Sequence, residues 1–502
     1  MREMNRPPLV LPENFVVATR DSGYRSTAYS VAEFIDNALQ AAATRITIDV
    51  RPGRDGQYPA EILVCDDGEG MDARVLANAL PFGGTSRFDD RTSLGRYGMG
   101  LPNGAMSRCR RVTVYTWRNK SEVLMAYLDL DEILARRHRT LSPVKKVARP
   151  PFLPKTSHGT AVHLTQCDRL EYKRISALID RLRREMGRIY RRFLTHRVEI
   201  FVNGEPVTPH DPLFLDPPSG NAEARPFGDV LDYELSTPAG VGNVTVRFAE
   251  LPIERWHHLP SERKRELGVT SGSCVYVMRA DREIDHGWFF MGGKRRENYD
   301  DWWRCEVSFD PTLDELFGIT HAKQQIRPTD ALLQVLVPDL EPIGRALNSR
   351  VRKRFELAKL RTPLGAAESQ AARASEFLSP LPRRRDRVPE EVRESLRESD
   401  HQAPYRICIA ELQTTAAFEV VVRDRALVLL INARHPLYKD LYGPLAASDS
   451  ERDQDIAKHV ALAVLAAAHA EAEVVNKVDR GRLQRFRQEW ADVLATFYTT
   501  GR

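Results

Sequence analysis

The chain has 502 residues and a formal net charge of +5, and its 42% hydrophobic and 28% charged residues are typical of a soluble globular protein. The length predicts roughly two to four domains, and because the sequence shows neither a long apolar run nor the pattern of a secretory leader, we expect a cytoplasmic protein without a membrane span. Its six cysteines form no CxxC pair, so we interpret them as reduced thiols, and the small positive charge permits nucleic-acid contact without arguing for it.

The first 200 residues predict an arm followed by an α/β domain. Residues 1–20 are polar and contain three prolines, so we expect an extended N-terminal arm. In the domain at 21–197 the sequence predicts helices at 28–43, 72–80 and 171–195, strands at 46–50, 61–65, 112–117, 123–130 and 160–164, and loops at 81–100 and 141–156. The loop at 81–100 is long and rich in small polar residues, which is typical of a functional lid.

The rest of the chain predicts a second domain, a linker and a small module. The second α/β domain is expected at 198–362, beginning with a strand at 198–202 and the tight-turn pair Asn203-Gly204. Its expected helices are at 311–316 and 329–358. Residues 363–403 are rich in charge, proline and serine and predict a flexible linker. Residues 404–502 predict a C-terminal α/β module, with strands at 405–411, 417–422 and 426–432 and helices at 451–474 and 480–498.

The helix at 28–43 carries Glu33, Asp36 and Asn37, which combine carboxylate and amide chemistry. Glu33 and Asn37 are four residues apart, so they share one helix face. An amide oxygen on that face can ligate Mg²⁺, and a carboxylate beside it can accept a proton from an attacking water. An exposed polar helix face is the competing interpretation of these residues taken alone.

Two glycine-containing segments follow. Asp66 ends an apolar strand and precedes Gly68 and Gly70. Since glycines allow close backbone approach, this carboxylate can accept a hydrogen bond from an exocyclic amine such as that of adenine, although a simple Asp-Gly turn is the alternative. The loop from Gly95 to Gly100 can bring backbone N–H groups to phosphate oxygens. No GxxxxGK[ST] sequence is present, which excludes a P-loop enzyme.

The order of these motifs along the chain resembles that of a known family. A helical Glu-x-x-x-Asn, a strand followed by Asp-x-Gly-x-Gly, a Gly-x-x-Gly-x-Gly loop and a strand beginning Gly159-Thr160 resemble the four-box signature of the GHKL ATPases. This superfamily includes DNA gyrase B subunits, MutL, ninety-kilodalton heat-shock chaperones, histidine kinases and MORC proteins. The resemblance implies a Bergerat fold, an α/β sandwich that holds ATP under a lid. A histidine kinase is disfavoured, because Glu33 is present and only roughly 30 residues precede the site.

The resemblance also implies roles for individual residues. Glu33 would be the general base that activates water, Asn37 the Mg²⁺ ligand, and Asp66 the partner of the adenine N6 amine. Thr160 stands where a threonine assists that contact through water. The other implied nucleotide-binding positions are Asp36, Gly68, Gly70, Met71, Gly95, Gly98, Met99, Gly100 and Leu101. ATP and Mg²⁺ are therefore the cofactors that we expect.

The second domain is expected to be a transducer-like, ribosomal-protein-S5-like α/β domain. In gyrase, MutL, the chaperones and MORC proteins, a lysine of this domain contacts the γ-phosphate. Lys323 lies in a polar loop before a long helix and is similar to that lysine, and its cation would stabilise charge on the transferring phosphate. A surface lysine is the alternative. The lid segment resembles MORC ATPases most, although Pro102 stands where many MORC lids carry a lysine.

By resemblance, we expect an ATPase that forms a homodimer when it binds ATP and acts as a clamp on DNA, in genome defence or DNA maintenance and alongside other defence proteins. A heat-shock-type chaperone and an ATP-gated scaffold with little turnover are the alternatives. Arginines in the helix at 171–195 suit either DNA phosphates or a solvated helix face. They include Arg183, Arg184, Arg191 and Arg192.

Overall fold

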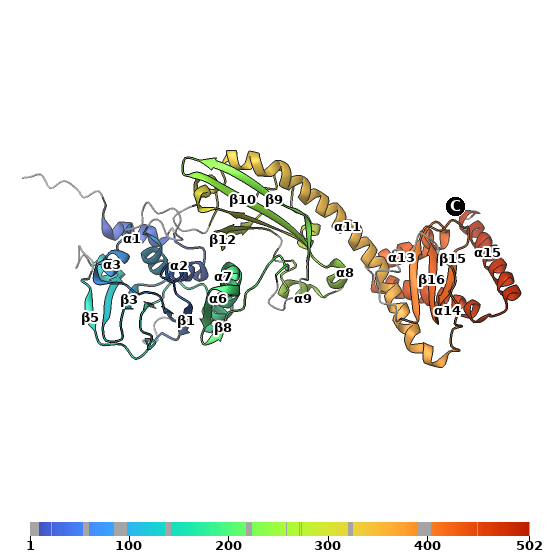
Figure 1. Cartoon of the computed structure of the whole chain (residues 1–502), viewed down its shortest axis with the longest axis horizontal. Coiled ribbons are helices and arrows are strands. Elements are labelled where there is room, and N and C mark those ends of the chain that lie inside the picture. Colours follow the sequence, from blue (N-terminus) through green and yellow to red (C-terminus); the bar gives the residue numbers. More distant parts are fainter. Residues whose placement is uncertain are drawn as a thin grey trace, which may run out of the picture. The chain divides into compact units, whose positions relative to one another are not determined.

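The structure is a computed structural model that describes most of the chain (Figure 1). The described residues are 10–21, 23–53, 60–84, 98–135, 142–216, 223–257, 259–270, 272, 274–319, 325–388, 403–448 and 450–500. Contacts divide the chain into two compact units, Met1–Pro252 with Leu259–Asn348, and Ile253–His258 with Ser349–Arg502. Within the described ranges, no helix has the length and apolar character needed to cross a membrane.

Among its described residues, the first unit contains an eight-stranded mixed sheet. Its strands are β1 (Arg45–Arg51), β2 (Glu61–Asp66), β3 (Arg111–Trp117), β4 (Val123–Asp129), β5 (Lys145–Val147), β6 (Gly159–Thr165), β7 (Glu199–Val202) and β8 (Glu205–Pro206). They lie in the order β5-β4-β3-β6-β2-β1-β7-β8, and β1 and β7 are parallel while the other neighbours are antiparallel. The β2–β6 register sets Asp66 opposite Thr160, so two predicted site residues meet at one end of the sheet.

Helices pack on this sheet and bury its apolar side chains. They are α1 (Pro12–Asp21), α2 (Thr27–Gln40), α3 (Ala73–Ala79), α4 (Gly100–Met106), α5 (Leu130–Leu134), α6 (Ile175–Ile189) and α7 (Arg191–His196). Ile35 of α2 and Leu182 of α6 share one buried core with Ile48 and Ile62 of the sheet. On the sheet's other face, Trp117 packs in a smaller cluster with Leu153 and other apolar residues. The predicted α/β sandwich is therefore confirmed.

Residues 12–21 form helix α1, so the extended arm predicted for 1–20 is wrong for that part of the chain. The helix begins at Pro12, and proline is compatible with the first turn of a helix because an N–H there would have no intrahelical partner. Tertiary contacts hold α1, since Val16 is buried and Arg20 Nε donates to the Met106 carbonyl at 2.7 Å. The predicted loop at 141–156 also contains a strand, because β5 pairs with β4.

The strand predicted at 198–202 exists as β7 but pairs with β1, so it belongs to the first sheet and not to the second domain. Asn203 and Gly204 adopt positive φ values of 50° and 82° and turn the chain into β8, as the Asn-Gly pair predicts. The predicted helix at 171–195 is interrupted at Tyr190, whose φ of −105° and ψ of 19° separate α6 from α7.

A second sheet completes the first unit. Its strands are β9 (Arg225–Thr237), β10 (Gly240–Glu250), β11 (Val275–Arg279), β12 (Arg282–Gly287) and β13 (Trp303–Phe309), in the order β12-β11-β13-β10-β9. Short helices accompany it: α9 (Ser261–Glu266), η1 (Asn298–Trp302), η2 (Pro311–Leu313) and α10 (Asp314–Phe317). The helix α11 (Asp330–Ala374) begins on this sheet, where Trp303 Nε1 donates to Asn348 Oδ1 at 2.8 Å.

The linker predicted at 363–403 is wrong in its first part, because α11 continues unbroken to Ala374. Leu364 and Ala367 are buried there in one core with Ile407 and Leu429, which fixes the helix despite its polar composition. The short helix η3 (Ser375–Phe377) follows, and residues 389–402 lie outside the described residues.

The C-terminal module has the strands and long helices that the sequence predicts. Its described elements are β14 (Tyr405–Ala410), β15 (Phe418–Arg423), β16 (Ala426–Asn432), η5 (Leu437–Tyr442), α13 (Gly443–Ala447), α14 (Glu451–Glu473) and α15 (Lys477–Thr500). The second unit also includes α8 (Ile253–Trp256) from earlier in the chain. The strand order is β14-β16-β15, with β14 and β16 parallel. Alanines at one face of α14 pack into the core of this module.

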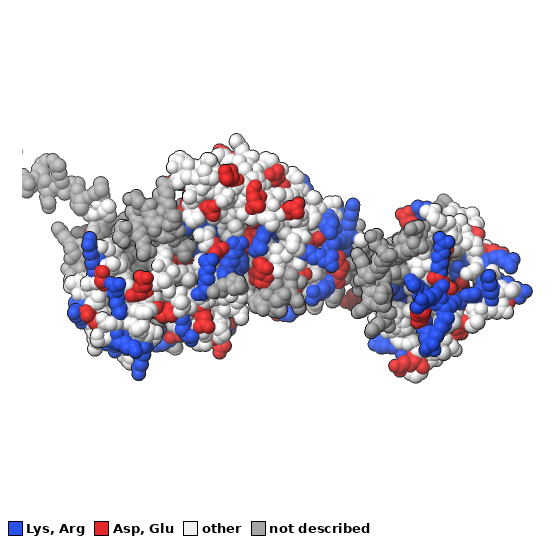
Figure 2. Space-filling view, viewed as in Figure 1, with Lys and Arg blue, Asp and Glu red and all other residues white. Residues whose placement is uncertain are grey.

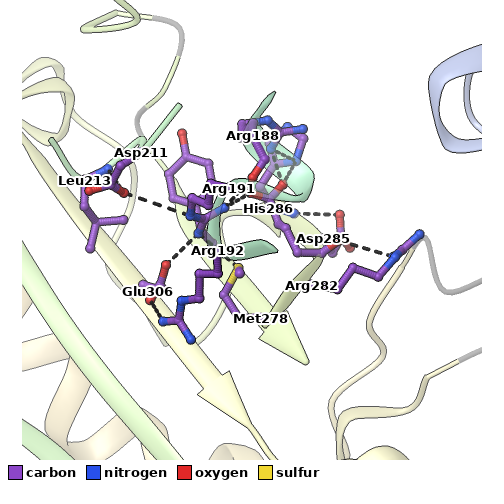
Figure 3. A network of polar contacts seen from close by, with 12 residues as sticks. Arg188, Arg191, Arg192, Asp211, Leu213, Met278, Arg282, Asp285, His286 and Glu306 are labelled. Carbon is purple, nitrogen blue, oxygen red and sulfur yellow. Dashed lines mark hydrogen bonds and ion pairs between the residues drawn. The ribbon is translucent and has the colours of Figure 1, made fainter. Parts of the chain in front are cut away.

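A layer of ion pairs joins α6 and α7 to the second sheet (Figure 3). Arg191 donates to Glu283 at 2.8 Å and to Glu306 at 2.6 Å, and Arg188 also pairs with Glu283. Arg192 reaches Glu306 at 2.6 Å. Both carboxylates are almost completely buried. Arg191 is therefore buried within the protein, which contradicts both the DNA-contact and the solvated-face interpretations for this side chain, whereas the paired Arg192 side chain stays 33% exposed.

Candidate nucleotide site

Glu33 lies on a helix that is buried along almost its whole length. In α2 both Glu33 and Asp36 are buried, with exposed fractions of 2% and 0%, whereas Asn37 is partly exposed. Tyr24, just before the helix, lies near Glu33, and burial together with the Glu33 carboxylate raises the pKa of its hydroxyl well above the usual value. The site thus sets a buried carboxylate one helical turn from a more accessible amide.

Helix α4, which follows the predicted lid loop, packs directly on the Glu33 side of α2. A Cβ at Gly100 would lie 2.4 Å from Glu33 Oε2, so only glycine fits there without displacing the carboxylate. A Cβ at Gly104 would meet the Ser30 carbonyl at 3.3 Å, and Ser30 Oγ donates to the Gly104 carbonyl at 2.7 Å. The start of α4 is consequently fixed against the acid group of α2.

Asp66 ends β2 with its carboxylate held by backbone N–H groups. Oδ1 accepts hydrogen bonds from Gly68 N at 2.9 Å and from Thr160 N at 3.2 Å. Burial raises the pKa of Asp66 to about 6, although these two hydrogen bonds oppose the shift. Within the described part of the chain, Oδ2 accepts no hydrogen bond, so one oxygen is positioned and the other can meet a ligand.

The turn after Asp66 is built around close backbone approaches. Gly70 has a φ of +68°, and a Cβ there would lie 2.3 Å from the Trp117 carbonyl, so a side chain is excluded. Met71 N donates to Thr116 Oγ1 at 2.8 Å, and Thr116 Oγ1 lies 3.3 Å from Thr160 Oγ1. The hydroxyls of two neighbouring strands therefore gather beside Asp66. The sequence analysis missed Thr116. Only its pairing with Thr160 in the β3–β6 register, which the structure provides, marks it as part of the site.

The turn that follows Asp66 contacts the C-terminal end of α2, the helix that carries Glu33. A Cβ at Gly68 would lie 2.8 Å from both the Ala41 Cβ and the Ala41 carbonyl, and Glu69 N donates to that carbonyl at 3.0 Å. The turn carrying Asp66 thus rests on the residue that ends the helix carrying Glu33. This contact brings together residues that are distant in sequence.

The remaining predicted positions lie near the start of α4 or outside the described residues. Gly98 has a φ of +61°, and its carbonyl accepts a hydrogen bond from Gly83 N at 3.1 Å. Met99 is the residue before α4, and Leu101 is buried in the first turn of that helix. Gly95 in the lid and Lys323 in the second domain lie outside the described residues, so their predicted roles remain predictions.

Asp36 has partners within the protein. Its Oδ1 accepts from Arg282 Nε at 2.8 Å and lies 2.7 Å from the Tyr190 hydroxyl, which is also 2.7 Å from the Ala32 carbonyl. Arg282 belongs to β12 of the second sheet and is completely buried. Sequence reasoning missed Arg282 and Tyr190, because no local pattern links residues so far apart in the chain.

The comparison with protein families bears directly on this site. Residues 24–160 match the family model described as histidine kinase-, DNA gyrase B-, and HSP90-like ATPase. These residues are a GHKL ATPase domain. The matched range includes α2, the Asp66 turn, the start of α4 and the first residues of β6. The resemblance drawn from the four motifs is confirmed.

Curated relatives place the GHKL ATPase domain near the MORC group. ATPase MORC2B of Mus musculus is 37% identical over 102 residues, which cover 20% of this chain and 10% of that protein. ATPase MORC2 of Homo sapiens is 38% identical over 78 residues, covering 15% and 8%. Protein MICRORCHIDIA 6 of Arabidopsis thaliana is 32% identical over 105 residues, covering 20% and 15%. The matched segments span a small part of each relative, so the likeness concerns the GHKL ATPase domain.

Proposed function

We propose that this chain binds and hydrolyses ATP, with Glu33 as the general base. The observation that carries the proposal is the Glu33 carboxylate, which is buried on α2 and packed against Gly100 at the start of α4. A water on this carboxylate would give up its proton as it attacks the γ-phosphate. Burial removes competing water from the carboxylate and holds it in one position, which favours a general base.

Asn37 is the residue that we propose as the Mg²⁺ ligand. Its amide is partly exposed and one turn from Glu33, and Mg²⁺ commonly takes one or two protein ligands beside substrate phosphates and water. When bound with ATP, the ion would neutralise charge on the phosphates. Lys323 remains the residue predicted to steady the γ-phosphate, and Lys323→Ala should then lower turnover.

We propose that Asp66 recognises the adenine base of ATP. Its Oδ1 is held by Gly68 and Thr160, which leaves Oδ2 to accept a hydrogen bond from the adenine N6 amine. The partly exposed Thr160 lies opposite Asp66, and its hydroxyl can hold a water that supports this contact, while the buried Thr116 hydroxyl lies 3.3 Å from the Thr160 hydroxyl.

The direct test is ATP turnover by the wild type and by Glu33→Ala. The wild type should release phosphate from ATP, whereas the variant should retain ATP binding within about threefold and lose hydrolysis by roughly a hundredfold or more. Glu33→Gln keeps the shape of the side chain and should lose hydrolysis as well. Unchanged turnover in both variants would show that Glu33 is not the base.

The proposed function extends to an ATP-gated homodimer that closes on DNA, in defence or DNA maintenance within the cytoplasm. Its support is the likeness of the GHKL ATPase domain to MORC ATPases. Charge gives a second reason, since Lys and Arg gather on the visible face of the C-terminal module in Figure 2. Helix α15 carries Arg480, Arg482 and Arg485 within two turns. Such clusters suit phosphate backbones.

Size-exclusion chromatography with light scattering tests this clamp. With a non-hydrolysable ATP analogue, the chain should shift from monomer to dimer and retain circular plasmid at high salt, while linearised plasmid should slide off. A chain that stays monomeric with the analogue would rule out the clamp. ATP turnover stimulated by an unfolded protein and not by DNA would favour a chaperone instead.

A further inference from the structure

The edge strand β12 of the second sheet reaches the helix that carries Glu33. Arg282, the first residue of β12, donates from Nε to Asp36 Oδ1 at 2.8 Å, and the side chains of this pair are 0% and 1% exposed. The two residues are 246 positions apart in the chain. This ion pair is thus a direct contact between the second sheet and α2.

Asp36 stands between the two residues of α2 that the proposed reaction uses. It lies three residues after Glu33 and directly before Asn37. Burial alone would lower the pKa of Arg282, but Asp36, Tyr190 and Glu33 together raise it above its usual value, so the guanidinium stays charged beside all three. Because both charges are buried and paired, the ion pair restrains Asp36 and with it the neighbouring part of α2.

A second contact from β12 supports the same conclusion. Asp285 accepts a hydrogen bond from Arg25, just before α2, at 2.7 Å. It also accepts one from Ile326 N at 3.2 Å, two residues after the undescribed segment that contains Lys323. Arg282 and Asp285 are labelled in Figure 3. One strand therefore holds the start of α2, the middle of α2 and the chain near Lys323.

We propose that Arg282 is a positioning residue for hydrolysis, which acts through Asp36 to hold Glu33 and Asn37 in their reactive orientation. The inference rests on the proposed function. It makes the second sheet part of the hydrolytic machinery rather than only a neighbouring domain, because hydrolysis then requires β12 to be seated on α2. Nucleotide binding at Asp66 lies on β2 and does not require this contact.

The test compares Arg282→Lys, Arg282→Met, the double variant Asp36→Asn with Arg282→Met, and the control Asp281→Asn. Asp281 is the neighbour of Arg282 and pairs with Arg192 on α7, so its variant loosens the same junction without touching α2. Its φ of 69° suits asparagine. The readouts are kcat and KM for ATP, the Kd for ADP, and the melting temperature.

Arg282→Met alone can fail to fold, because it leaves Asp36 buried without its cation. The double variant removes both charges and should melt near the wild-type temperature and lose kcat on the order of tenfold to a hundredfold. Arg282→Lys keeps Asp36, so it should bind ADP within about twofold and give an intermediate kcat, and Asp281→Asn should match the wild type.

A double variant with wild-type kcat would overturn the inference, as would a kcat that falls equally in Asp281→Asn. Parallel losses of ADP affinity, melting temperature and kcat would also overturn it, since a merely loosened fold predicts them. The proposed function fails separately, if the wild type and Glu33→Ala release phosphate at the same rate.

Discussion

Asp66 combines a partly buried carboxylate with a hydrogen-bond geometry that leaves one oxygen to a ligand. Burial raises the pKa of its carboxyl to about 6, which places its titration near neutral pH. The charged form accepts a hydrogen bond from an amine more strongly than the protonated form. Adenine carries such an amine, whereas guanine presents a carbonyl at the same position. The selectivity of the site should therefore depend on pH.

We expect ATP affinity to fall as the pH drops through about 6, because Asp66 then gains a proton and its oxygen becomes a weaker acceptor. Between pH 7.5 and 5 the loss should be roughly tenfold. Asp66→Asn should lose most of this pH dependence and of the preference for ATP over GTP. Titration calorimetry with both nucleotides measures these effects. The nucleotide itself also gains protons over this pH range, but it does so equally with the wild type and with Asp66→Asn, so comparing the two proteins removes that contribution. Equal pH profiles would contradict the role of Asp66.

Gly100 is required by the space beside Glu33. Gly100→Ala would place a methyl group 2.4 Å from Glu33 Oε2, so either the carboxylate or α4 must shift. A shift near 1 Å should lower kcat by roughly a hundredfold. Gly365→Ala is the matched control, because a Cβ there meets nothing within 4 Å and should leave kcat unchanged. Full activity in Gly100→Ala would mean that Glu33 need not occupy its present position.

At the scale of elements, the joint between α7 and the second sheet depends on Glu306. Burial alone would raise the pKa of Glu306, but Arg191, Arg247 and Arg192 lower it to about 2. An acid with a depressed pKa stabilises the folded state above its unfolded pKa, and this stabilisation disappears as the pH falls through the folded pKa.

The contribution of Glu306 should be roughly 3 kcal/mol at neutral pH and should be lost between about pH 4.5 and 2. Glu306→Gln should destabilise the protein by at least a similar amount and reduce the acid sensitivity. Chemical denaturation at several pH values measures both. The exposed pair Arg45–Glu199 supplies the control, because Glu199→Gln should cost about 1 kcal/mol at most. Similar losses in the two variants would contradict a special role for the buried layer.

The elements that sequence predicts best are those whose own residues specify them. The alternation in β1 and the apolar spacing in α6 are local: β1 forms close to its predicted position, and α6 and α7 together occupy most of the predicted helix. Prediction failed where distant contacts outweigh local composition. Helix α1 and the polar part of α11 are stabilised by buried residues whose partners lie far along the chain.

The same distinction applies to the site. Glu33, Asp66 and Gly100 belong to short motifs whose order and spacing together carry the family resemblance that implies their roles. Arg282, Tyr190 and Thr116 have no such motif, because what matters is their position in the folded sheet. A single sequence therefore predicts the groups proposed to contact the nucleotide more readily than the residues that hold those groups in place.

At the scale of the whole molecule, the GHKL ATPase domain does not include the second sheet or the C-terminal module. The Arg282–Asp36 pair ties the second sheet to that domain within the first unit, and the buried layer around Glu306 ties the same sheet to α7. Such contacts can couple the nucleotide state to the rest of the chain, provided that hydrolysis occurs at Glu33.

The most direct test of that condition is the identity of the nucleotide on the protein after a single turnover. Excess wild type and excess Glu33→Ala are each mixed with labelled ATP and Mg²⁺, and the bound nucleotide is separated after a fixed time. The wild type should carry ADP, and the variant should carry ATP in nearly the same total amount. Equal conversion to ADP in both proteins, or no ADP from the wild type, would contradict a hydrolytic site built on Glu33.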